Sequence, residues 1–147
     1  MAFYGSGEGI TSLVQGDEQG SRVTTTTNRT LTSTYVNHLQ VSRTVPAGHT
    51  GHFSAWAWFG TMREEASGGI QIRCLVSGTA SITGYEYQGH SGFEDHDGGS
   101  AMPNWFFTLG PGSYTFSLQV REWDDNIILN NYGSVDSFAV NGFYVRD

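Results

Sequence analysis

Residues 113–122 read SYTFSLQVRE, and polar and apolar side chains alternate without a break from Ser113 to Arg121. The apolar set is Tyr114, Phe116, Leu118 and Val120, and the polar set is Thr115, Ser117, Gln119 and Arg121. Successive side chains of a strand point to opposite faces. This period of two therefore predicts a β-strand with one face against a hydrophobic core and the other in solvent.

Glycine and proline mark turns on either side of this strand and elsewhere in the chain. The predicted turns lie at Pro46–Gly48, at Ser77-Gly78 as a two-residue hairpin, at 110–112 (GPG), and at Asn141-Gly142 as a bulge or tight turn. The first of them leads into a strand predicted from His52 to Phe59.

The fold class follows from the spacing of these signals. No helix-length window has apolar residues at i, i+3, i+4 and i+7, and the strands are short, with turns about every 8–12 residues. We expect an all-β fold, an antiparallel β-sandwich or jelly roll of about eight or nine strands. It should span residues 22–147, preceded by an extended, glycine-rich N-terminal arm over residues 1–21.

Composition limits the partners that the protein can have. Seven arginines and 14 acidic residues among 147 give a net charge of −7, which argues against a nucleic-acid partner. No signal peptide and no membrane-spanning stretch are predicted, so we expect a soluble product made in the cytoplasm. The one cysteine, Cys74, shares a predicted strand face with Ile70, Ile72 and Val76, which indicates a buried free thiol and no internal disulfide.

The segment GHSGFEDHDGGS (89–100) collects possible metal ligands. They are His90, Glu94, Asp95, His96 and Asp97. The spacing fits no regular site, because an EF-hand loop starting at Asp95 would need a glutamate where Phe106 stands, and the two histidines are separated by a flexible loop. A weak Ca²⁺ site and a catalytic metal stay open, but a solvated loop is favoured, and no metal or other cofactor is predicted.

Catalytic patterns are equally weak. No Gly-x-Ser-x-Gly elbow occurs, and the pair Glu64-Glu65 lies in a predicted turn, where carboxylates are usually solvated. We therefore expect that the protein is not an enzyme.

The stretch HFSAWAWF (52–59) is apolar on both strand faces, with Trp56 and Trp58 opposite Phe53. A strand with one solvent-exposed face should alternate apolar and polar residues. We therefore expect the second face of this strand to be covered by another layer of this chain, by a neighbouring subunit, or by a sugar stacked on the rings. We predict that subunit or partner contacts involve Trp56, Trp58, Trp105 and, in the arm, Phe3 and Tyr4.

Several segments together resemble small jelly-roll proteins of tailed-bacteriophage virions. They are TLTSTYVNHLQVS (30–42), TVPAG (44–48), IRCLVSGTA (72–80), TLGPGSYTFSLQV (108–120) and SFAVNGFYVRD (137–147). That group includes capsid decoration proteins and fibre heads, commonly trimeric and similar in shape to tumour-necrosis-factor domains.

The resemblance implies a non-enzymatic virion structural protein, foremost a capsid decoration protein on the capsid surface, assembled in the host cytoplasm. Its partners would be copies of itself, as a homotrimer, and the major capsid protein, with no nucleic acid or membrane. The alternative is a tail or fibre module that binds a receptor or carbohydrate through exposed aromatic residues and the loop at 89–100.

Because the loop at 89–100 lacks fixed ligand geometry, removing divalent ions should leave the protein unchanged. We expect excess EDTA to shift neither the melting temperature nor the assembly state. Calorimetry and light scattering with and without EDTA measure both, and a drop in melting temperature would restore the metal hypothesis.

Overall fold

The structure is a computed structural model that describes residues 13–14, 21–60, 62–63, 69–90, 103–122, 128–129 and 135–147. Eight strands make up the body: β2 (Ser21–Thr25), β4 (Val36–Val45), β5 (His49–Trp58), β7 (Gly69–Gly78), β9 (Tyr87–His90), β10 (Asn104–Leu109), β11 (Gly112–Glu122) and β13 (Asp136–Arg146). Five strands of two residues accompany them: β1 (Leu13–Val14), β3 (Arg29–Thr30), β6 (Met62–Arg63), β8 (Ile82–Thr83) and β12 (Ile128–Leu129).

The eight strands pair in a nested antiparallel order, from the outermost pair in the sequence to the innermost. The first pairs with the last (β2·β13), the second with the seventh (β4·β11), the third with the sixth (β5·β10) and the middle two with each other (β7·β9). The ladders β13·β5 and β11·β7 then join these hairpins into two sheets. We call them the β5 sheet (β2-β13-β5-β10) and the β11 sheet (β4-β11-β7-β9).

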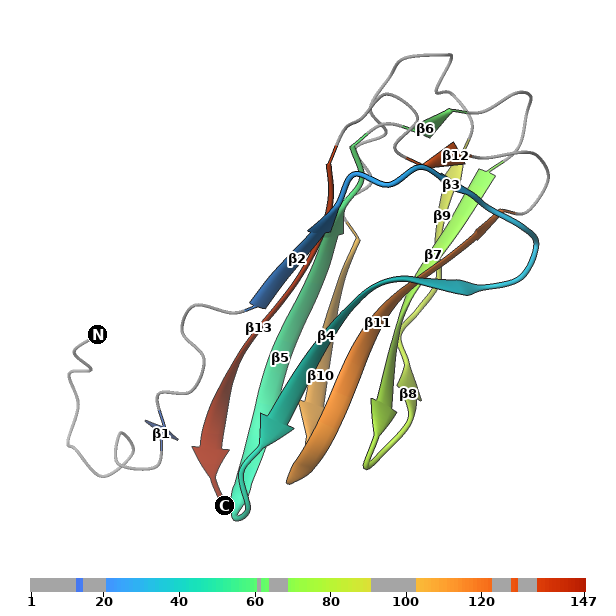
Figure 1. Ribbon diagram of the computed structural model, residues 1–147. Helices are drawn as coiled ribbons and strands as arrows, with labels where there is room; N and C mark the ends of the chain where they lie inside the picture. The colour runs from blue at the N-terminus through green and yellow to red at the C-terminus, as the bar shows by residue number, and fades with distance from the viewer. Residues whose placement is uncertain are drawn as a thin grey trace.

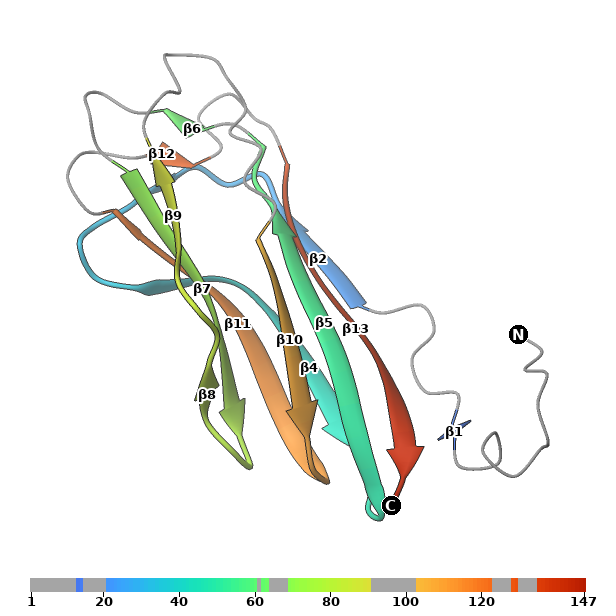
Figure 2. The same cartoon turned by 180° about the vertical axis from the view of Figure 1, so that it is seen from behind.

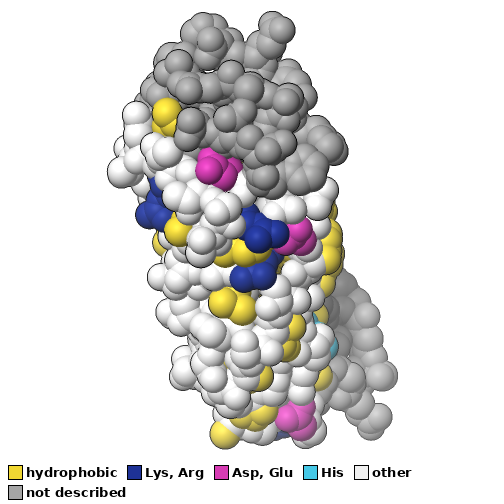
Figure 3. All heavy atoms as spheres, turned by 90° about the vertical axis from the view of Figure 1, so that its right-hand side faces the viewer, with side chains coloured by type: hydrophobic (Ala, Val, Ile, Leu, Met, Phe, Trp, Pro, Cys, Tyr) yellow, Lys and Arg dark blue, Asp and Glu magenta, His cyan; other side chains and the backbone are white. Residues whose placement is uncertain are grey.

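The two sheets lie face to face as an antiparallel sandwich (Figure 1, Figure 2). This nested pairing is the jelly-roll arrangement, so the predicted fold class is confirmed. The short strands β3, β12 and β6 form a small third sheet at one end of the sandwich. Figure 3 views the molecule from the side on which β7, β8 and β9 lie.

The predicted strand faces form the core. On β11 the inward set is the predicted one, Tyr114, Phe116, Leu118 and Val120, each at most 4% exposed. Cys74 of β7 is fully buried beside them, as expected, and burial raises the pKa of its thiol to about 12. The thiol is therefore protonated at neutral pH and is not a nucleophile.

Phe53 of β5 crosses the space between the sheets. Its ring lies over two glycines, since a Cβ would come within 2.6 Å of it at Gly51 and 2.4 Å at Gly142. The ring meets Phe116 of the other sheet at a centroid distance of 5.2 Å. Gly142 faces Phe53 in an unbroken ladder, so the bulge or turn predicted at Asn141-Gly142 is wrong. Glycine is needed there to make room for the ring.

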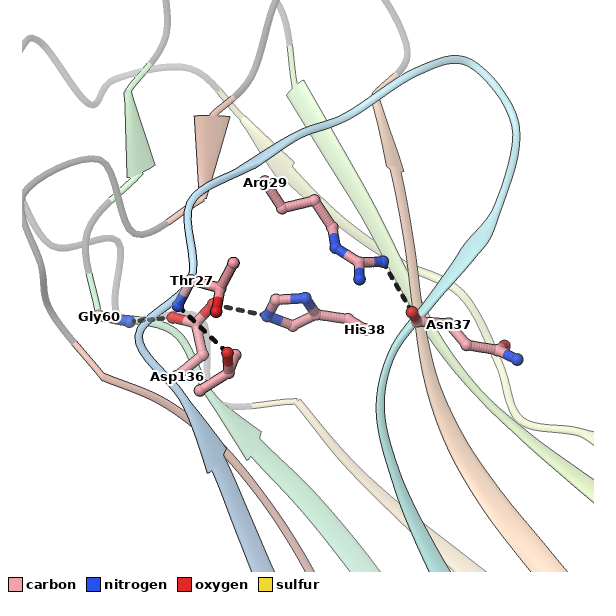
Figure 4. A network of polar contacts seen from close by, with 7 residues as sticks. Thr27, Arg29, Asn37, His38, Gly60 and Asp136 are labelled. Carbon is pink, nitrogen blue, oxygen red and sulfur yellow. Dashed lines mark hydrogen bonds and ion pairs between the residues drawn. The ribbon is translucent and has the colours of Figure 1, made fainter.

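A bulge occurs instead in β4, where His38 is the extra residue opposite β11. The bulge turns His38 inward, and its Nε2 lies 2.7 Å from Oδ2 of Asp136 on β13 (Figure 4). The other oxygen of Asp136 accepts the Gly60 N–H at 2.8 Å. The two side chains are 1% and 0% exposed, so this pair links the two sheets away from water.

The turns agree with the sequence at two of the remaining three positions. Gly48 (φ 70°) and Gly112 (φ 147°) sit at the turns predicted around them. The hairpin turn predicted at Ser77-Gly78 is displaced, because both residues still pair with β11 and the chain turns over residues 79–81. The strand predicted from His52 begins earlier, at His49.

Only a small part of the predicted arm is described. Leu13 and Val14 pair with Val145 and Tyr144 at the end of β13, and β2 begins at Ser21. The subunit or partner contacts expected of Phe3 and Tyr4 in the arm stay a prediction. Within the described ranges there is no helix with the length and apolar character that a membrane span needs.

Replacing Gly78 with alanine should destabilise the fold. Gly78 has φ 127°, and a Cβ there would lie 2.2 Å from the Ser113 carbonyl oxygen. We expect the free energy of unfolding, measured by urea denaturation, to fall by about 2–3 kcal/mol. Gly110→Ala is the matched control in the next turn, where a Cβ meets nothing within 4 Å, and should change stability by less than about 1 kcal/mol. Equal losses would contradict this difference.

Candidate functional site

The outer side of the β5 sheet carries a cluster of aromatic side chains. Alternation along β5 buries Phe53, Ala55 and Ala57 and turns Trp56 and Trp58 outward. The neighbouring strands add Phe106 from β10 and Phe143 from β13. We call the outward side of β5, β10 and β13 the aromatic face.

These aromatic side chains are exposed to different degrees. Phe106 is 77% exposed, Phe143 50% and Trp58 39%, whereas Trp56 is half-buried between Asn104 and Ala139, its partners in the register. Single exposed apolar residues are ordinary, but several on one sheet form an apolar patch that is open to contact.

The aromatic face is also uncharged. The outward positions of β5, β10 and β13 between Thr50 and Trp58, Asn104 and Thr108, and Ser137 and Val145 include no Asp, Glu, Lys or Arg. Arg22 stands at the edge, on β2, and donates a hydrogen bond to Ser137 Oγ at 2.8 Å. Covering this face therefore desolvates hydroxyl, amide and imidazole groups but no ion, which keeps the cost of binding low.

A groove of about 400 Å³ crosses the aromatic face between Phe106 and Phe143. Its lining also includes Ser54, His52 and Asn141. The His52 ring stacks on Phe143 at a centroid distance of 5.2 Å, and its Nδ1 lies 3.2 Å from Thr108 Oγ1. The groove thus combines two aromatic walls with neutral hydrogen-bonding groups, which suits a neutral, partly apolar ligand.

The structure places the predicted contact residues in different environments. Trp56 and Trp58 lie together on the aromatic face, opposite the core side of their strand, as the sequence indicated. Phe3 and Tyr4 lie outside the described residues.

Trp105 is in the core, so its prediction as a contact residue is corrected. The side chain is 1% exposed, and its indole N–H donates to the Tyr85 carbonyl at 2.9 Å. It packs against Gly84, where a Cβ would come within 2.5 Å of the ring. Trp105 therefore closes the edge of the sandwich between β8 and β10 and offers no surface to a partner.

Phe106 and Phe143 were missed by the sequence analysis. The strand 104–109, NWFFTL, carried a usable signal, because a period of two with Trp105 and Phe107 inward places Phe106 outward. Phe143 was missed because a bulge or turn was expected at Asn141-Gly142. Without that irregularity, the alternation of side chains along the last strand would have placed Phe143 on the outward face.

Metal ligands do not gather in the described part of the chain, where no three His, Cys, Asp or Glu side chains come together. The loop at 89–100 lies outside the described residues, except for the backbone of Gly89 and His90 in β9. The hypothesis that this loop binds a metal stays a prediction, and the EDTA experiment tests it.

The sequence matches no protein-family model and no curated protein. Two solved virus structures match this chain weakly. The infectious bursal disease virus VP2 subviral particle matches with a TM-score of 0.37 and 9% identity, over 91% of this chain and 43% of that chain. Infectious bursal disease virus of the Gx strain matches with a TM-score of 0.28 and 8% identity, over 88% and 41%. This chain spans less than half the length of either neighbour.

Two adjacent phenylalanines test the assignment of the aromatic face. Phe107→Ala removes a side chain that is 7% exposed and lies 5.7 Å from Phe116, and should cost about 3–5 kcal/mol of unfolding free energy. Phe106→Ala removes an exposed side chain and should cost less than about 0.5 kcal/mol. Urea titration at low protein concentration measures both, and a reversed order would show that the strand faces are exchanged.

Proposed function

We propose that the protein is a non-enzymatic structural component of a virion, namely a capsid decoration protein of a tailed bacteriophage that works as a homotrimer. The observation that carries this proposal is the uncharged aromatic face, which exposes Trp58, Phe106 and Phe143 on a rigid sheet. The sequence resemblance to jelly-roll virion proteins supports the same class.

The aromatic face is large enough to form much of a subunit interface. Its three strands, about 4.8 Å apart and up to ten residues of about 3.3 Å each in length, span roughly 480 Å². A typical stable interface buries about 800 Å² on each partner, with aromatic residues enriched at its centre. In a closed ring of three the contact is heterologous, so the β10 side of one copy would meet the β13 side of the next.

The proposed trimer would act by mass action on the shell. A protein that binds the assembled capsid surface, but not free capsid subunits, stabilises the assembled state by RT ln(1 + c/Kd) for each site, where c is its free concentration. This role needs folded stability and matching surfaces but no chemistry. The histidine–carboxylate pair described here, His38 with Asp136, supports this, because both side chains are buried beyond the reach of a substrate.

The second candidate is a tail or fibre module that binds a carbohydrate. The groove between Phe106 and Phe143 favours it, because a sugar ring can stack its C–H groups on aromatic walls while Ser54 and Asn141 bond its hydroxyls. Both candidates use the aromatic face, and they differ in what covers it.

Sedimentation equilibrium tests the proposed trimer. We expect a particle of about three times 16.1 kDa for the wild type and dissociation towards monomer for Trp58→Ala and for Phe106→Ala. Ile82→Ala is the matched control, since Ile82 of β8 is 38% exposed, like Trp58, but lies on the other sheet. A wild-type monomer unaffected by either aromatic substitution would refute self-association through this face.

Co-sedimentation with capsids separates the two candidates. We expect the purified protein to pellet with assembled shells and to leave a glycan array unlabelled. Binding to glycans that Phe143→Ala abolishes, with no pelleting, would favour the carbohydrate module instead.

A further inference from the structure

The outer side of the β11 sheet has a different chemistry, centred on two arginines and one tyrosine. Tyr35 precedes β4, and its ring lies across β7 and β11. The guanidinium carbon of Arg73 is 3.8 Å from the ring centroid, and that of Arg121 is 4.5 Å from it. We call these three side chains the arginine–tyrosine cluster.

Cross-strand amides fix both guanidinium groups. Arg73 Nε donates to Gln119 Oε1 at 2.8 Å, and Arg121 Nε donates to Gln71 Oε1 at 2.5 Å. Each arginine lies directly opposite its glutamine in the β7·β11 register. In one pair the arginine is on β7, and in the other it is on β11. Because the bonds use Nε, they set the planes of the guanidinium groups without occupying the Nη atoms.

In the described part of the chain, Glu86 is an acidic residue that contacts the cluster. Glu86 accepts a hydrogen bond from the Tyr35 hydroxyl, and its Oε2 lies 3.8 Å from Arg121 Nη2. Partial burial and this bond to Glu86 raise the pKa of Tyr35 to about 12, so the phenol is neutral. Among the contacts of the described residues, the two arginines of the cluster thus meet the carboxylate of Glu86, on a protein whose net charge is −7. Figure 3 shows basic side chains gathered at mid-height of this side, next to acidic ones.

We propose that the arginine–tyrosine cluster is a docking site for the carboxylates of an acidic segment of a partner protein. A guanidinium that lies over an aromatic ring and is fixed by a hydrogen bond at Nε presents a preorganised fork that binds a carboxylate in a bidentate manner. Bringing two such groups to one ring costs repulsion, which an incoming anion relieves.

An acidic peptide fits this surface better than a nucleic acid does. The net charge of −7 repels a long polyphosphate, whereas two carboxylates match the Nη donors of Arg73 and Arg121. The inference goes beyond the proposed function, because it concerns the sheet opposite the aromatic face and holds whether or not the protein self-associates.

Fluorescence anisotropy of a labelled peptide, Gly-Glu-Asp-Glu-Glu-Asp-Gly, tests the site on the full chain. We expect binding by the wild type that weakens as salt is raised, and at least tenfold weaker binding by the double variant Arg73→Gln with Arg121→Gln. Arg146→Gln, which removes one exposed charge at the C-terminal end of β13, is the control and should bind like the wild type. The same peptide with Gln and Asn in place of its acids should not bind.

The double variant Arg73→Lys with Arg121→Lys separates fork geometry from charge. We expect it to bind several-fold more weakly than the wild type, since an ammonium group makes no bidentate contact. If the melting temperature shows that the glutamine variant does not fold, the lysine variant still tests whether the two guanidinium groups bind the peptide. Undiminished binding by the lysine or glutamine variant, no binding by the wild type, or tighter binding of an oligothymidylate of equal charge would each overturn the proposal.

Sedimentation of the same variants should show unchanged self-association, so failure of this site and failure of the trimer are distinguishable.

Discussion

The contact between Phe53 and Phe116 is the constraint on which the other features depend. It joins the centres of the two sheets at a ring distance of 5.2 Å, and Phe107 completes it from β10. The ring of Phe53 fits only because Gly51 and Gly142 lack a Cβ. Once Phe53 and Phe116 point inward, the period of two determines which of the remaining side chains on β5 and β11 point inward and which point outward. The outward position of the tryptophans, and that of Arg121, follows from this core contact.

Much of this fold could be predicted because it is encoded locally. The alternation at 113–122, the strand face of Cys74 and the glycine turns each need only a short window of sequence. The errors arose where a residue responds to a distant partner. Gly142 reads as a turn signal until Phe53 is seen opposite it, and the bulge at His38 is set by Asp136, almost a hundred residues away. Neither partner is visible in a local pattern.

The candidate site was predictable to a similar extent. Trp56 and Trp58 stood out because one strand was apolar on both sides, and a single strand suffices to see that. Trp105 was misassigned because a tryptophan next to a loop can face either way, and only packing on Gly84 and the bond to Tyr85 decide it. The arginine–tyrosine cluster could not be found at all, since it combines a residue before β4 with residues of β7 and β11, which become neighbours only through the sheet order.

A sandwich of two sheets has two broad outer sides, and in this protein their chemistry differs. The aromatic face carries no ion at its outward positions on β5, β10 and β13, whereas the other side holds Arg73 and Arg121 against Tyr35. A face without ions is inexpensive to desolvate completely and suits permanent contact between copies. A face with preorganised charges retains its solvation until a complementary partner arrives, and suits selective recognition. Because outward residues alternate with core residues, each side can change its partner without disturbing the contact between Phe53 and Phe116. The jelly roll therefore gives one small chain two outer sides of different chemistry, one for the proposed self-association and the other for the proposed recognition of a different protein.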